Sequence, residues 1–176
     1  AAQTKKHGPM IFKSEDFGMN WVPVKVPPKF STSKKVAHIY RLTPGHASEP
    51  NVWYAGTSPQ GLFKSEDFGD TWQEVSGFNN HPQLDEWCGN PVSSTLKYEK
   101  IHSIMVHPQN SRSLIIGMAS GGVFESMDGG ESWTSMNEGL STTDVSDSLG
   151  RDPHLVVQHP MDPNRIYQQN QGGIFR

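Results

Sequence analysis

The sequence has few of the features that mark several large classes of protein. Its 176 residues include one cysteine, Cys88, so no internal disulfide can form. Fifteen Lys and Arg residues stand against 18 Asp and Glu residues, and the net charge of −3 gives no electrostatic signature of nucleic-acid binding. No apolar run approaches the roughly 18 residues of a membrane span, and the N-terminal residues lack the apolar segment of a signal peptide. We therefore expect neither nucleic acid nor a membrane among its partners, and the sequence assigns no compartment.

Long helical patterns and cofactor fingerprints are also lacking. No stretch of ten or more residues carries the apolar stripe of an amphipathic helix. Neither a phosphate-binding loop nor a dinucleotide fingerprint occurs, and we predict no cofactor. In contrast, aromatic residues make up 10% of the chain and include five tryptophans, a composition that argues against disorder.

Internal repeats dominate what is present. The pattern apolar-Phe-x-Ser-x-Asp-x-Gly-x-x-Trp occurs three times and begins a fourth time: 11–21, 62–72, 123–133 and 172–176. A second pattern, His-x5-Pro, starts at three histidines in the same order: His38, His102 and His154. Two independent patterns with similar spacing indicate a repeat architecture.

Each repeat reads as four short strands, which we call A to D from the innermost outward. Val, Ile, Tyr, Phe and Trp dominate these runs, with Gly, Pro, Asn and Asp between them. The sequence therefore predicts an all-β fold, a β-propeller of four-stranded antiparallel blades with about three blades' worth of strands, or a partial ring. Residues 1–176 form one such segment, with blade parts at 1–29 (strands C and D), 36–77, 100–138 and 153–176 (strands A to C).

The Ser-x-Asp-x-Gly-x-x-Trp segments resemble the Asp-box, or bacterial neuraminidase, repeat of sialidases, sortilin-type receptors, xyloglucanases and photosystem assembly factors. The sequence around these segments is most similar to bacterial sialidase-like or glycosyl-hydrolase-like Asp-box proteins, as in GGVFESMDGGESW and HPMDPNRIYQQNQGGIFR. The resemblance implies a β-propeller, and it implies little about function because one fold hosts many functions.

The boxes themselves have a structural interpretation. On a hairpin between strands C and D, glycine takes a positive φ, Asp and Ser hydrogen-bond the turn, and Trp is buried between neighbouring sheets. The alternative is a set of catalytic or calcium sites, which identical context in every repeat argues against. The residues concerned are Ser14, Asp16, Gly18, Trp21, Ser65, Asp67, Gly69, Trp72, Ser126, Asp128, Gly130 and Trp133.

A binding site is expected on the opposite face, where the D–A loops are long and irregular. His38, His102 and His154 start successive inner strands and can converge on a ligand; the alternative is a repeated structural hydrogen bond. We predict no metal site. The loop 77–100 adds Asn80, His81 and Trp87, a mix suited to a sugar, although Trp87 can equally pack as a lid. Asn170 belongs to a polar turn on the same face.

An enzyme is not demonstrable from these residues. Asp85 and Glu86 are weak candidates for the carboxylate pair of a glycoside hydrolase, whose spacing decides the stereochemistry. By the resemblance, a sialidase needs three arginines and a Tyr–Glu pair, a set that is not seen here. Two hypotheses remain open: a glycan-binding, glycoside-hydrolase-like propeller, and a non-catalytic interaction or assembly scaffold. Open blade edges further predict self-association or a missing remainder of the propeller.

Overall fold

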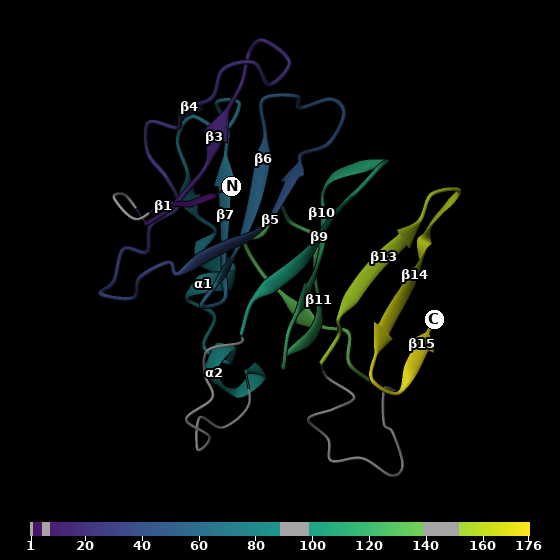
Figure 1. Ribbon diagram of the computed structural model, residues 1–176. Coiled ribbons are helices and arrows are strands. Elements are labelled where there is room, and N and C mark those ends of the chain that lie inside the picture. Colours follow the sequence, from purple (N-terminus) through teal and green to yellow (C-terminus); the bar gives the residue numbers. More distant parts are fainter. Residues whose placement is uncertain (1, 5–7, 89–98, 139–151) are drawn as a thin grey trace.

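The computed structural model describes residues 2–4, 8–88, 99–138 and 152–176, which are almost entirely β-structure (Figure 1). All strand pairings in named strands are antiparallel, and two sheets have four strands each in sequence order. The sheets follow one another from the N-terminal to the C-terminal end of the molecule, as successive blades do (Figure 1). The predicted all-β class of four-stranded antiparallel sheets is confirmed.

The two complete sheets lie in the middle of the chain. The first consists of β5 (His38–Pro44), β6 (Trp53–Ser58), β7 (Gly61–Ser65) and β8 (Gln73–Glu74). The second consists of β9 (Ile101–His107), β10 (Asn110–Met118), β11 (Gly122–Ser126) and β12 (Thr134–Ser135). The last sheet has three strands, β13 (Leu155–His159), β14 (Asp162–Asn170) and β15 (Gly173–Phe175).

The N-terminal residues form two two-stranded sheets, which we count together as the N-terminal sheet because β2 is followed directly by β3, and one of their strands was not indicated by the sequence. Its pairs are β1 (Ala2–Thr4) with β2 (Gly8–Met10), and β3 (Phe12–Lys13) with β4 (Val22–Pro23). Thr4 pairs with Gly8 as Thr57 pairs with Gly61 in the next sheet. The β1 strand therefore occupies the place of the end of strand B, beside the expected strands C and D.

The segment after β8 holds two single-turn helices, where the sequence predicted only a loop. These are α1 (Ser76–Asn79) and α2 (Leu84–Trp87), at the end of the molecule away from the β5–β6 turn (Figure 1). Phe78 and Leu84 are buried in the core. Both helices are far shorter than the ten residues over which a helical stripe can be recognised, so periodicity does not reveal them.

The core lies between successive sheets rather than inside any one of them. Between the N-terminal sheet and the sheet of β5 to β8, Ile11 and Val24 pack with Phe63 and Trp72. The largest cluster joins the two complete sheets: Val52, Tyr54, Leu62, Val75, Phe78, Leu84, Ile101, Ile104, Leu114, Ile116, Met118, Phe124 and Trp133. A smaller cluster of Ile115, Val123 and Val156 joins the last two sheets. Each sheet is thus stabilised mainly by its neighbours, as in other repeat architectures.

Candidate functional site

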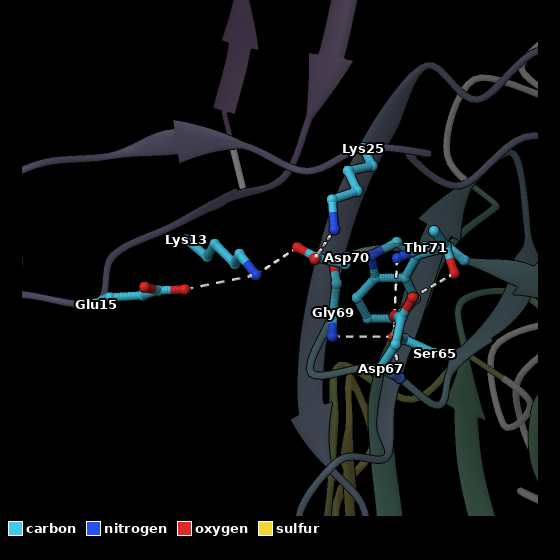
Figure 2. Close-up of polar contacts among 9 residues, drawn as sticks. Lys13, Glu15, Lys25, Ser65, Asp67, Gly69, Asp70 and Thr71 are labelled. Atoms are coloured by element: carbon cyan, nitrogen blue, oxygen red, sulfur yellow. Dashed lines mark hydrogen bonds and ion pairs between the residues drawn. The ribbon is translucent and has the colours of Figure 1, made fainter.

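The three Asp-boxes form the same hydrogen-bonded hairpin. In the second box, shown in Figure 2, Ser65 Oγ donates to Asp67 Oδ1 at 2.8 Å and accepts from the Gly69 N–H at 2.9 Å. Asp67 also accepts from the N–H and hydroxyl of Thr71, at 2.8 and 2.7 Å. The other two boxes repeat these contacts around Asp16 and Asp128. Every carboxylate is therefore occupied by its own turn.

These hydrogen bonds lower the pKa of each box carboxyl. The Thr71 hydroxyl and N–H, with Ser65, hold the pKa of Asp67 at about 2. Asn20 and Ser14 hold that of Asp16 at about 2, and Ser132 lowers that of Asp128 in the same way. The box acids are anions fixed in hairpins and are not suited to donate protons near neutral pH.

Box tryptophans behave differently in the first sheet. Trp72 and Trp133 are each only 5% exposed, and both pack against the preceding sheet. Trp21 is 61% exposed, although its Nε1–H still donates to the Gly18 carbonyl at 3.0 Å. The prediction that Trp21 is buried is therefore wrong, because no sheet precedes the first one among the described residues.

The residue after each box Asp adopts a left-handed backbone, a feature that the sequence analysis missed. Phe17 and Phe68 have φ values of 56° and 60°, and Gly129 has 80° at the same place. The box glycines Gly18, Gly69 and Gly130 also have positive φ, between 85° and 98°. A phenylalanine tolerates this region poorly, so nothing in its type signals the conformation.

The strand register corrects the alignment of the three histidines. Gly56 and Gly117 are equivalent, since each pairs with the residue preceding the box Phe. Gly56 pairs with Arg41 of β5, and Gly117 pairs with Ser103 of β9. The residues that precede these partners, Tyr40 and His102, are therefore equivalent. In the last sheet Gln169 pairs with both Ile174, which precedes the box Phe, and Leu155, so the equivalent residue is His154, just before β13. His38 is offset by two residues, because the His-x5-Pro spacing follows the turn and not the sheet.

His102 and His154 meet at one pocket, and His38 does not reach it. We call it the inner-strand pocket; its volume is about 300 Å³ and it is lined by Lys100, His102, Ala119, Ser120, Asp152, Pro153 and His154. The Ser120 N–H donates to Asp152 Oδ1 at 2.9 Å, which joins the β10–β11 turn to the segment before β13. His38 is exposed on β5 and contacts Tyr40 edge-on.

His102 is a half-buried side chain of this pocket. Its Nδ1 lies 2.9 Å from Ser103 Oγ, which accepts the Val156 N–H from the next sheet at 3.1 Å. Its Nε2 is buried and has no well-aligned hydrogen-bond partner among the described residues, although the nearby Pro153 carbonyl opposes part of the pKa shift. Burial lowers the pKa of His102, so the ring is neutral near pH 7.

Trp87 packs into the core and offers no open ring face. Its indole stacks on His81 at a centroid distance of 4.1 Å and lies 4.4 Å from Phe124 of the next sheet. Two rings this close to one indole occupy both of its faces, since they would collide on the same one. Of the two alternatives, this geometry is that of the lid and not of a sugar-stacking platform.

The remaining loop candidates do not join the pocket. Asp85 and Glu86 are exposed on α2, and neither lines the pocket that contains Asp152. Asn80 is exposed, while its neighbour Asn79 hydrogen-bonds both the N–H and the carbonyl of Leu62. The rest of the predicted loop, 89–98, lies outside the described residues.

Asparagines at two other turns have structural contacts. Asn170 is 3% exposed, and its Oδ1 accepts the Gly172 N–H at 2.8 Å in the β14–β15 turn. Asn137 holds the start of β11 through the Val123 N–H and the Gly121 carbonyl, as Asn79 holds β7. Sequence reasoning missed Asn79 and Asn137 because their distances from the box differ.

Nucleophilic and metal chemistry find little support in the described part of the chain. Burial raises the pKa of Cys88 to about 12, so its thiol stays protonated. Within the described ranges no group of three or more His, Cys, Asp or Glu side chains is placed to hold a metal ion. The same residues include no helix long and apolar enough to cross a membrane.

Taken together, the successive four-stranded sheets and their C–D hairpins are those of a β-propeller. Two of the repeats, at residues 11–24 and 62–75, match the family model of the BNR-Asp box repeat. The third box, 123–133, lies outside the matched residues but forms the same hydrogen bonds. No curated protein has a sequence similar enough to count as a relative of this chain.

Solved structures share the fold at low sequence identity. An ancestral GH74 enzyme superposes with a TM-score of 0.58 and 19% identity, over 93% of this chain and 19% of its own. The Niastella koreensis GH74 enzyme gives 0.58 and 20%, over 93% and 22%. The GH74 xyloglucanase from Xanthomonas campestris gives 0.56 and 20%, over 93% and 23%. The chain spans about a fifth of the length of these proteins, and such identity shows the fold alone.

Proposed function

We propose that this Asp-box propeller segment binds a glycan through the face that carries the D–A loops. The observation that carries the proposal is the inner-strand pocket, where His102 and His154 from adjacent sheets meet Lys100 and Asp152. Imidazole, ammonium and carboxylate groups together match the hydroxyls and ring oxygens of a sugar. At about 300 Å³ the pocket is at the lower end of the size range of small-molecule sites.

Binding, rather than hydrolysis, is what these residues support. Among the described residues, Asp152 is the one carboxylate that lines the pocket, whereas a glycoside hydrolase uses two that flank the bond. Asp85 and Glu86 are exposed elsewhere. Although one fold neighbour is a xyloglucanase, an identity of 20% concerns the fold, so the proposal rests on the pocket.

The test is a titration of the chain with neutral and acidic oligosaccharides, followed by NMR. We expect His154→Ala, at an exposed pocket position, to weaken binding several-fold. His38→Ala is the matched control, since His38 is an exposed histidine outside the pocket. No binding of any oligosaccharide at millimolar concentration, or equal losses from both variants, would contradict the proposal.

A second candidate is an interaction scaffold that associates with a further copy of itself. It is favoured by two apolar surfaces, one at each end of the row of sheets, that no neighbouring sheet covers among the described residues. Ile174 is 75% exposed. Its counterparts in the preceding sheets, Leu62 and Val123, are only 0% and 5% exposed because the next sheet covers them. At the other end Trp21 is 61% exposed, while Trp72 and Trp133 are buried. A head-to-tail contact between copies, or a further part of the propeller, covers both surfaces.

Sedimentation equilibrium tests this second candidate. We expect a mass above that of the monomer, reduced by Ile174→Asp and by Trp21→Ala. Met161→Asp is the control, because Met161 is 86% exposed in the β13–β14 turn, away from these surfaces. A monomeric mass at tens of micromolar protein argues against association and leaves the glycan proposal unaffected.

A further inference from the structure

A cation, Lys100, lines the inner-strand pocket. Lys100 takes part in none of the ion pairs formed among the described residues. Its Nζ lies 4.8 Å from the centroid of the Tyr40 ring, which positions the ammonium between the inner strands β5 and β9. A lysine held over an aromatic ring keeps its N–H donors available for an anionic ligand group.

His102, which lines the same pocket, supplies a second donor. The Ser103 hydroxyl accepts the Val156 N–H and can donate its own hydrogen to His102 Nδ1. That arrangement places the proton of the neutral ring on Nε2. Because Nε2 is buried beside the Pro153 carbonyl without a well-aligned hydrogen bond in the described structure, the ring must turn to present this N–H to an acceptor in the pocket.

Asp152 provides the opposite polarity. Its Oδ1 already accepts the Ser120 N–H, at 2.9 Å. Its Oδ2 lies 3.9 Å from His154 Nε2, which is longer than a hydrogen bond. This oxygen can therefore accept a ligand hydroxyl, and the half-exposed His154 ring lies beside it.

Resting on the proposed glycan binding, we propose that the pocket recognises a uronic-acid residue, with its carboxylate at Lys100 and His102 and a hydroxyl at Asp152. The lining supplies donors and an acceptor around a volume of about 300 Å³, enough for one sugar ring. A uronate carries both complementary groups on one ring. A neutral sugar leaves the Lys100 charge unpaired, and a simple anion leaves Asp152 unused.

The experiment compares each member of a panel of uronate oligosaccharides with its own methyl ester, by calorimetry at low and at physiological salt. The two ligands differ only in the carboxylate charge. We expect the acid to bind about tenfold more tightly than the ester, with a preference that shrinks as salt rises. Lys100→Gln is expected to abolish the preference, and Lys100→Arg to retain it.

Lys64→Gln is the charge-matched control. Lys64 pairs with Glu66 beside the second Asp-box, away from the pocket, so its loss is expected to leave the preference intact. Equal affinities for acid and ester overturn this inference while the glycan proposal stands. Competition by acetate or phosphate as strong as that by the uronates also overturns it. Failure of acids, esters and neutral oligosaccharides alike overturns both proposals.

Discussion

At the scale of single residues, the Asp-box depends on contacts between residues two to four positions apart. The Ser65 hydroxyl reaches the Gly69 N–H, and the Trp72 Nε1–H donates to the Gly69 carbonyl at 2.9 Å. Because these contacts are local, the spacing of the motif alone predicts them. The left-handed residue after Asp is different, since Phe68 occupies a conformation that its side chain disfavours.

Substitutions at Phe68 and Gly69 are expected to differ in their effect on the free energy of unfolding. In Phe68→Gly, relief of left-handed strain offsets the greater freedom of the unfolded chain, so stability changes by less than about 0.5 kcal/mol. In Gly69→Ala, φ stays at 85° and the left-handed backbone costs about 1–2 kcal/mol. Denaturant unfolding of the two variants measures the difference. Equal destabilisation would show that Phe68 makes a contact that stabilises the fold.

The box carboxyls also predict how stability depends on pH. In the folded chain Asp16 and Asp67 have a pKa of about 2, below the ordinary value of 3.8. A lowered folded pKa adds stability that is present above the ordinary value and is lost as the pH falls through about 2. We expect the melting temperature to fall between pH 4 and about 2, and Asp67→Asn to reduce that fall. An unchanged pH profile in the variant would contradict this.

At the scale of strands and sheets, the junctions between sheets differ in what closes them. Lys13 in β3 and Lys25, shortly after β4, both pair with Asp70 in the second Asp-box, as Figure 2 shows. At the next junction the counterpart of Lys25 is Ser76, and a cavity of about 400 Å³ lies beside it. Close backbone contact closes this junction, because a Cβ on Gly77 would lie 2.2 Å from the Glu131 carbonyl oxygen.

This close approach makes Gly77 a sensitive position. Gly77→Ala forces α1 away from the third Asp-box and is expected to cost about 1–3 kcal/mol of unfolding free energy. Ser76→Ala is the neighbouring control, since Ser76 is exposed. Thermal and denaturant melts of both variants measure the effect. A Gly77→Ala variant as stable as Ser76→Ala would show that the junction yields without loss of packing.

At the scale of the whole molecule, stability depends on how many neighbours a sheet has. The two complete sheets are packed on both sides, whereas the first and last sheets each contact one neighbour among the described residues. In a linear array of repeats, units with fewer interfaces open more easily.

Hydrogen exchange is expected to follow this order. The amides of β6, β7, β10 and β11 should exchange most slowly, and those of β3, β4 and β15 most rapidly, because the latter strands lack a covering sheet on one side. Exchange monitored by mass spectrometry at the level of peptides measures this. Uniform protection across all sheets would indicate that another surface covers the ends, as association between copies does.

The sequence by itself determined the repeat, the β-propeller class and the internal contacts of each box, because these depend on composition, period and short-range spacing. The tertiary structure decided everything that depends on contact between sheets. It buries Trp72 and leaves Trp21 exposed. It encloses Trp87 between His81 and Phe124. It shows that Tyr40, and not His38, is the equivalent of His102. It also brings Lys100, His102 and Asp152 together from two sheets. A residue's own neighbours in the chain do not specify which sheet will face it, and only the packed blades supply that information.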